Sequence, residues 1–224
     1  MRFGTVGAMP PLSIVPVFAM ASLALLLIPG PSVLYVVGRS GSQGRKAGLV
    51  SVLGVHTGTV FHVLAAAVGL SALVMASTVV FTAVKVLGGV YLITLGVRTL
   101  LSTRAIGVEP VIPARPLRRL YLDGVIVNLF NPKVALFFLA FLPQFIDGSH
   151  GPVWSQTLVL GLLYLTLGLL SDGTYALVGA RAGRWLNARP KRQRMTRKTE
   201  GGLLIGLGVT ALLAPRSRVK YVRS

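Results

Sequence analysis

The chain contains no cysteine, and only five of its residues are acidic. The absence of cysteine excludes a disulfide framework, a thiolate-bound zinc or iron–sulfur centre, and thiol-redox chemistry. Only 12% of the 224 residues are charged and 53% are hydrophobic, whereas soluble domains carry about 25% charged residues. A single soluble core could not bury so much apolar surface, but a lipid bilayer can. We therefore predict an all-α polytopic membrane protein.

The 23 lysines and arginines outnumber the acids and give a net charge of +18. They cluster at 39–46, 104–119 and 181–198, each time between long apolar stretches. This is how the positive-inside rule marks cytoplasmic loops. A nucleic-acid partner would need a basic face on a folded domain, so none is expected. The stretch 181–198 also suits anionic lipid headgroups, although topology alone is the simpler explanation.

The apolar stretches predict about six transmembrane helices, since one crossing needs roughly 20 apolar residues. The predicted spans are 12–38, 47 to about 71, about 77–101, 120–146, 153–180 and a short sixth at 201–214. Neither 70–78 nor 147–152 contains Lys or Arg, so both are placed opposite the basic loops. Six spans put both termini outside the cytoplasm. The basic tail at 215–224 conflicts with this placement, because basic segments favour the cytoplasmic side. The side of the C-terminus is therefore left open.

The two halves echo each other around matched prolines. Gly30-Pro31 interrupts the first span and Asn131-Pro132 the fourth. Three spans per half would insert the halves in opposite orientations, as in inverted-repeat transporters. The predicted organisation is one domain over the whole chain, a 3+3 inverted repeat with broken helices 1 and 4. It comprises repeat 1 at about 12–101, a basic loop at 102–119, repeat 2 at about 120–214 and a tail at 215–224.

Each proline has a direct effect on its helix. A proline has no N–H and clashes with the carbonyl four residues earlier, so Pro31 should free the carbonyl of Leu27 and Pro132 that of Asn128. Each proline suits the first position of a new half-helix, with the residue before it as N-cap. Two half-helix N-termini at the midplane would favour a carboxylate. The alternative is that these prolines only kink the helices.

Charged residues deep inside predicted spans are costly and usually functional, and two of them stand out. Lys133 lies in the fourth span and Asp172 in the fifth. Asp172 is the best candidate partner for Lys133, and Asp123 a weaker one. The pair could bind a substrate or only fix the packing, and the sequence leaves both open.

The second span adds two histidines and a pair of glycines four residues apart. His56 could relay protons near neutral pH or simply bond to a neighbouring helix. Gly54 and Gly58 form a small-xxx-small pair suited to close helix contact. A metal exporter would need a cluster of intramembrane His, Asp or Glu, and the available set is thin: Asp172, Asp123, His56 and His62. No metal site or cofactor is therefore expected.

Catalytic motifs are absent from the sequence. It contains no HExxH, GxSxG or phosphate-binding loop. An enzyme acting on lipid would need a nucleophile beside a base. A pairing of Asp172 with His56 stays open, but we expect no enzyme.

Several segments together carry a resemblance to a known family. They are Ile28-Pro29-Gly30-Pro31-Ser32, the Gly44–Gly48 loop, Gly88–Leu92, and Asn131-Pro132-Lys133-Val134-Ala135 running to Phe141-Leu142-Pro143-Gln144-Phe145. In these segments, and over about 14–214, the chain resembles the lysine-exporter (LysE/RhtB) family of amino-acid efflux proteins. The resemblance implies a multi-pass protein of the cell (inner) membrane that exports amino acids or close derivatives by using the proton-motive force.

These observations combine into one predicted site. The substrate carboxylate would lie at the two breaks and its ammonium near Asp172, with Asn128 and Gln144 as polar neighbours. Asp172 and His56 would carry the coupling proton. The predicted substrate-binding residues are Gly30, Pro31, Ser32, Asn128, Asn131, Pro132, Lys133, Gln144 and Asp172. The expected partners are an amino-acid-like solute, protons and membrane lipids, with a homodimer as one candidate assembly. The alternatives are a metal or ion exporter of related build and, less favoured, a lipid-modifying enzyme.

Overall fold

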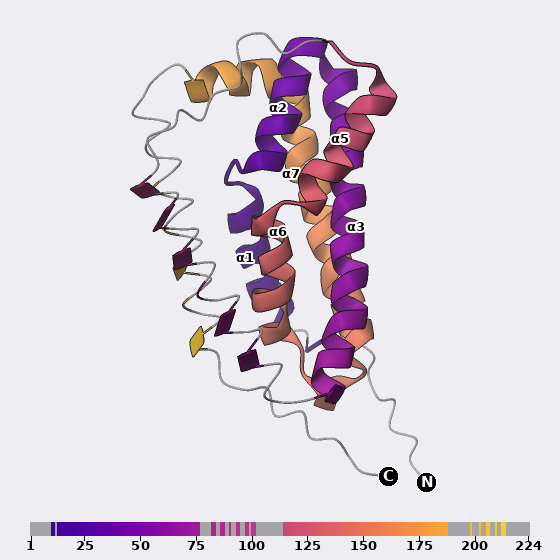
Figure 1. Ribbon diagram of the computed structural model, residues 1–224, viewed down its shortest axis with the longest axis vertical. Helices are drawn as coiled ribbons and strands as arrows, with labels where there is room; N and C mark the ends of the chain where they lie inside the picture. The colour runs from indigo at the N-terminus through magenta and orange to yellow at the C-terminus, as the bar shows by residue number, and fades with distance from the viewer. Residues whose placement is uncertain are drawn as a thin grey trace.

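The computed structural model describes residues 10–11, 13–76 and 114–187, with isolated positions within 82–101 and 198–213. Its main elements are all helical (Figure 1). They are α1 (Val15–Leu26), α2 (Pro31–Gln43), α3 (Arg45–Ala76), α5 (Leu117–Leu129), α6 (Pro132–Leu136), the π-helix η1 (Phe137–Phe141), the 3-10 helices η2 (Leu142–Phe145) and η3 (Gly148–His150), and α7 (Val153–Asn187). Only isolated positions of the predicted third and sixth spans are among the described residues, and the basic tail lies wholly outside them.

Two of the described helices are long and apolar enough to cross a membrane on their own. Arg45–Gly69 and Val153–Gly179 each qualify alone. Two further spans arise if each bent pair counts as one: Val15–Leu26 with Pro31–Gln43, bent by 55°, and Leu117–Leu129 with Pro132–Phe145, bent by 46°. The all-α polytopic fold is thus confirmed, with its two broken helices.

The two bends occur at the matched prolines. Pro31 is the first residue of α2, with Gly30 as its N-cap, and Pro132 is the first residue of α6. Asn131 caps α6 because its side chain accepts from the backbone N–H of Lys133. Local chemistry therefore sets both boundaries as expected, since a proline at this position has no N–H to leave unpaired.

The broken helices run in opposite directions through the molecule (Figure 1). From α1 to α2 the chain rises in that view, and from α5 to α6 it descends, so the two breaks come to the same level. The long helices α3 and α7 pack beside them and span both halves. This antiparallel arrangement is what inverted repeats produce.

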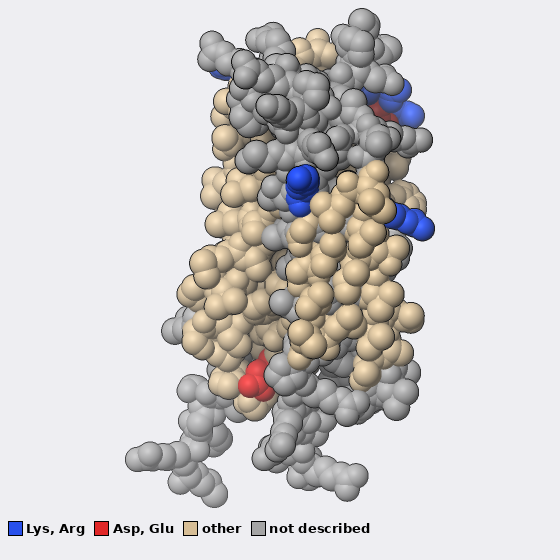
Figure 2. Space-filling model, turned by 90° about the vertical axis from the view of Figure 1, so that its left-hand side faces the viewer, with Lys and Arg blue, Asp and Glu red and all other residues tan. Residues whose placement is uncertain are grey.

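Charge divides the molecule along its long axis. The end of α2, the start of α3 and the segment that leads into α5 lie at one end of the molecule. They carry the basic residues Arg39, Arg45, Lys46, Arg115, Arg118 and Arg119. On the face in Figure 2, the described Lys and Arg side chains lie in the upper half, above a broad uncharged band. The 147–152 connection lies at the opposite end. The predicted separation of basic from non-basic connections therefore holds for the described loops.

Glycines bring α3 close to α5. A Cβ added at Gly58 would lie 2.9 Å from Asn128 Cβ and 3.0 Å from the Val125 carbonyl oxygen, and one at Gly124 would lie 2.9 Å from the Ser51 carbonyl oxygen. Gly54 abuts the backbone of Tyr121 even more closely. The predicted small-residue contact of α3 is confirmed, and any larger side chain there would push the helices apart.

An aromatic cluster packs the lower half. The Phe18 ring of α1 lies 5.7 Å from that of Phe137 and 5.2 Å from that of Phe145, centroid to centroid. Phe137 in turn lies 4.8 Å from the ring of Tyr164 on α7. Aromatic pairs at this spacing are favourable beyond the area that they bury. The cluster joins α1, η1, η2 and α7 below the breaks.

Candidate functional site

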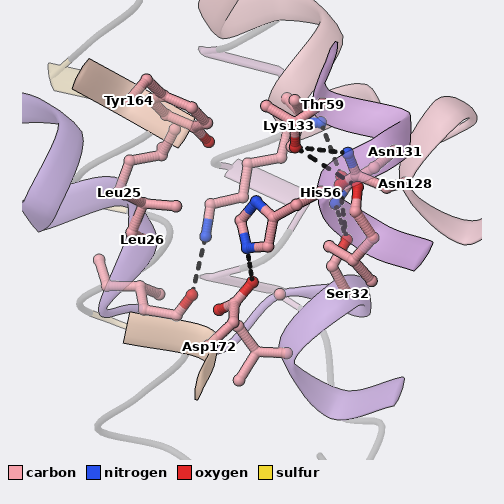
Figure 3. A pocket seen from close by; sticks show the side chains of 15 residues that line it. Leu25, Leu26, Ser32, His56, Thr59, Asn128, Asn131, Lys133, Tyr164 and Asp172 are labelled. Atoms are coloured by element: carbon pink, nitrogen blue, oxygen red, sulfur yellow. Dashed lines mark hydrogen bonds and ion pairs between the residues drawn. The ribbon is translucent and has the colours of Figure 1, made fainter. Parts of the chain in front are cut away.

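A buried pocket lies at the level of the two helix breaks (Figure 3). Its volume is about 30 Å³. Broken helices α1–α2 and α5–α6 form one side of it, and the continuous helices α3 and α7 form the other. It is lined by Leu25, Leu26, Ile28, Gly30, Ser32, Val33, Val55, His56, Thr59, Asn128, Asn131, Lys133, Val134, Tyr164 and Asp172.

Lys133 places an ammonium group in this pocket. Its side chain is buried, and Nζ donates a 2.9 Å hydrogen bond to the carbonyl oxygen of Ile28. That carbonyl lies two residues beyond the end of α1, close to the negative end of the helix macrodipole, which favours a cation. Nothing in the sequence indicated this acceptor. Asp123, the weaker candidate partner, instead pairs with Arg115 at 2.6 Å and Arg119 at 3.1 Å near the start of α5.

Asp172 and His56 face each other across the pocket between α7 and α3. His56 Nε2 lies 3.1 Å from Asp172 Oδ2, and both side chains are about 95% buried. The contact has the distance of an ion pair without the alignment of a hydrogen bond. Asp172 Oδ1 and His56 Nδ1 make no hydrogen bond to any described residue. Buried polar atoms in this condition are uncommon and favour a ligand or a transferable proton.

A polar network ties the two breaks together. Asn131 Nδ2 donates to Ser32 Oγ at 2.8 Å, and Ser32 Oγ donates to Asn128 Oδ1 at 2.9 Å. Asn128 Nδ2 then donates to Thr59 Oγ1 on α3 at 3.0 Å. All four side chains are at least 90% buried. In a membrane such bonds also keep the irregular backbone of the breaks paired.

The carbonyls that the prolines were expected to free have found other partners. Tyr175 Oη on α7 donates to the carbonyl oxygen of Leu27 at 2.8 Å. His62 Nε2 lies 3.1 Å from the carbonyl oxygen of Asn128, which also accepts from the N–H of Asn131. Side chains from the continuous helices thus complete both breaks.

Most of the predicted site residues meet here. The pocket lining includes Gly30, Ser32, His56, Asn128, Asn131, Lys133 and Asp172, and Pro31 and Pro132 start the half-helices beside it. Gln144 is not in the lining; it lies in η2 and donates to the carbonyl of Ala140. Sequence reasoning missed Thr59 and Tyr164. Thr59 follows His56 by three residues and so shares its helix face, whereas nothing in the sequence marked Tyr164.

A model of the LysE type translocator family matches residues 23–214. The chain belongs to this family. It is 30% identical to a homoserine/homoserine lactone efflux protein of Salmonella typhi over 197 residues, covering 88% of this chain and 94% of that protein. It is 28% identical to a leucine efflux protein of Enterobacter sp. (strain 638), covering 84% and 90%. An uncharacterised membrane protein of Bacillus subtilis is 28% identical over 88% of this chain and 96% of its own length. No solved structure matches the chain.

Membership makes the chain a multi-pass membrane transporter rather than an enzyme. In the translocator's pocket, Ser32 Oγ donates to Asn128 Oδ1. Within the described ranges, no group of three or more His, Cys, Asp and Glu side chains could hold a metal ion. What the pocket offers is one cation, one buried acid with a histidine, and a set of neutral hydrogen-bonding groups.

Proposed function

We propose that this translocator exports amino acids from the cytoplasm across the cell membrane in exchange for protons. The observation that carries the proposal is the placement of Lys133 and Asp172 in one buried pocket at two helix breaks. An amino acid carries one carboxylate and one ammonium on the same carbon. Opposite charges fixed in a site of low dielectric recognise such a molecule and reject solutes that lack either group.

The carboxylate of the substrate would bind at Lys133. An ammonium–carboxylate hydrogen bond is charge-assisted and stronger than the neutral one that Lys133 makes to Ile28. The backbone N–H groups at the start of α2 lie beside this position and carry the positive end of the helix dipole. The Ser32, Asn128 and Asn131 side chains supply further polar neighbours.

The substrate ammonium and the proton would share Asp172. Its Oδ1 atom has no hydrogen-bond partner among the described residues and is available to an ammonium. Protonation of the carboxylate from the outside would remove its attraction for the ammonium and release the substrate there. His56, 3.1 Å away, is placed to pass the proton. Inward movement of one proton supplies about 2.3 kcal/mol per 100 mV, equal to roughly a fiftyfold solute gradient.

The names of the relatives support an amino-acid substrate. Proteins that this chain resembles over more than four fifths of its length are named as efflux proteins for homoserine, homoserine lactone and leucine. Homoserine and leucine carry both charged groups, whereas homoserine lactone is a close derivative whose carboxyl group is a neutral ester. The side chain that this transporter accepts is not fixed by the pair of charges, because every amino acid offers the same two groups to it.

The experiment is efflux from cells preloaded with a panel of labelled amino acids. Wild type is compared with Lys133→Ala and Asp172→Asn at matched membrane levels, with and without a protonophore. Asp147→Asn is the matched control, because it makes the same chemical change in the 147–152 connection. We expect faster efflux with wild type and with the control, and loss of efflux in both pocket variants and with the protonophore.

Each other result discards one part of the proposal. Intact efflux in both pocket variants would keep the exporter and remove this site. Export that survives the protonophore would remove proton antiport. If wild type exports no member of the panel, the amino-acid substrate is wrong.

Two expected partners stay predictions. Contact of 181–198 with anionic headgroups concerns a stretch whose positions 188–197 lie outside the described residues. Its test is the binding of purified protein to vesicles with and without anionic lipid. A homodimer is tested by the mass of the detergent-solubilised protein.

A further inference from the structure

The pocket is too narrow for the substrate that we propose. Its volume of about 30 Å³ is a small fraction of the roughly 150 Å³ of an engineered protein cavity that binds benzene. An amino acid needs several times that space. One wall of the pocket must therefore move for a substrate to enter.

Three of the walls are held by tight contacts. Helices α3 and α7 pass the pocket without a break, and at Gly168 an added Cβ would lie only 2.5 Å from His56 Cε1. The start of α2 is bound to α5 and to the cap of α6 through Ser32, Asn128 and Asn131. Movement of any of these walls would separate closely packed or hydrogen-bonded groups.

The carbonyl end of α1 is held differently. Leu26 and Ile28 at this end line the pocket. A continuous helix would bond its carbonyls to backbone N–H groups of the next turn, but the break removes that supply. Side chains from two other helices replace it: Tyr175 Oη donates to the Leu27 carbonyl at 2.8 Å, and Lys133 Nζ donates to the Ile28 carbonyl at 2.9 Å.

We propose that Tyr175 is a positioning residue that latches the carbonyl end of α1 against the pocket, and that a bound substrate loosens this latch by drawing Lys133 away from Ile28. The second half rests on the proposed function, because it needs a substrate carboxylate. A carboxylate is a stronger acceptor than a neutral carbonyl, so it competes for the ammonium. Of the two side-chain hydrogen bonds to these carbonyls, only that of Tyr175 then remains, and the pocket widens on that side.

The latch can be weakened by removing one oxygen atom. Tyr175→Phe keeps the ring and loses the hydrogen bond to Leu27. Tyr121→Phe is the matched control: its hydroxyl lies 2.9 Å from Thr57 Oγ1 at the α3–α5 contact, and it does not line the pocket. One hydrogen bond of ordinary net strength shifts such an equilibrium by about fivefold.

The first test needs no substrate. The chain has no cysteine, so Leu26→Cys places one thiol in the pocket wall at a position that is 9% exposed. A small methanethiosulfonate reagent is added to the purified full chain in detergent, and the labelling rate is followed by mass spectrometry. We expect Tyr175→Phe to label about fivefold faster than the same probe with Tyr121→Phe. Equal or slower labelling would overturn the latch.

The second test uses transport. A loosened latch raises the fraction of molecules able to bind, so Tyr175→Phe should lower the KM for the exported amino acid by about the same factor. A merely structural defect would lower the maximal rate and leave KM unchanged. An unchanged or raised KM would overturn the role of Tyr175 in substrate entry. If wild type exports no amino acid, the proposed function fails, while the labelling rates still decide the latch.

Discussion

Asn131 donates a 2.8 Å hydrogen bond to Ser32 and so joins two helix breaks that lie 99 residues apart in sequence. The same side chain accepts from the N–H of Lys133 and caps α6. Ser32 passes the connection on to Asn128. One amide thus fixes the start of a half-helix and the relative height of the two breaks, which is the geometry on which the pocket depends.

Removal of this amide should destabilise the protein. Asn131→Ala loses an N-cap, which costs about 1 kcal/mol, and leaves the buried Ser32 hydroxyl without its donor at about 1 kcal/mol more. We expect the free energy of unfolding in detergent to fall by about 2 kcal/mol. Ser32→Ala alone and the double variant complete a cycle. Because the two side chains are bonded, the double variant should lose less than the sum of the single losses; strict additivity would contradict the network.

Replacing two glycines of α7 by alanine should have opposite effects on the protein. An added Cβ at Gly168 would lie 2.5 Å from His56 Cε1, whereas one at Gly173 meets no described atom within 4 Å. Gly168→Ala should therefore displace the imidazole from Asp172 and reduce proton-driven efflux at least tenfold. Gly173→Ala should keep efflux and raise helix stability by up to about 1 kcal/mol. The comparison uses efflux and thermal unfolding of both variants, and equal efflux would argue against His56 in coupling.

Lys133 should discriminate between a free carboxylate and a neutralised one. Wild type is expected to export an amino acid at least tenfold better than its amide, since a charge-assisted bond is about twice as strong as a neutral one. In Lys133→Met the amino acid and its amide should be exported at similar, low rates. The measurement is competition of each solute with a labelled amino acid during efflux. Persistent preference for the free acid in this variant would place carboxylate recognition elsewhere.

Asp147 should make a small contribution to stability that acid removes. Hydrogen bonds from the Ser149 hydroxyl and then its backbone N–H, with a smaller effect of His150, lower the pKa of the Asp147 carboxyl below its ordinary value. The stabilisation is present above the unfolded pKa of about 4 and is lost as the pH falls through the lower folded value. Because the side chain is about one third exposed, the effect should be a Tm difference of roughly 2 °C or less.

The measurement for this carboxyl is thermal unfolding between pH 3 and pH 7. The Tm of wild type should be higher than that of Asp147→Asn at pH 6, and this difference in Tm should shrink toward pH 3. Ser149→Ala removes the side-chain hydrogen bond that lowers the pKa of Asp147 most, so its Tm at pH 6 should lie between those of wild type and Asp147→Asn. A difference that does not change with pH would show that Asp147 acts only through its shape and not its charge.

Local chemistry made a large part of this structure predictable. Pro31 and Pro132 break their helices because proline lacks an N–H, and Asn131 caps the next half-helix because its side chain can accept from Lys133. The positions of the basic loops followed from the cost of burying charge in lipid. These effects act within a few residues of chain, so one sequence was enough to locate both breaks and the charged residues beside them.

Tertiary packing alone decided which groups meet. The bond of Lys133 to Ile28 spans 105 residues and that of Tyr175 to Leu27 spans 148. Neither a lysine nor a tyrosine in a sequence indicates which distant carbonyl it will bind. The sequence predicted Asp172 as the partner of Lys133 and left a pairing of Asp172 with His56 open, because either basic side chain can pair with a buried carboxylate. The glycine contacts that set helix α3 against α5 and α7 fix the distances between these groups. Composition and local geometry therefore determined a multi-pass chain with two broken helices, whereas helix–helix distances, which depend on the whole fold, built the pocket between them.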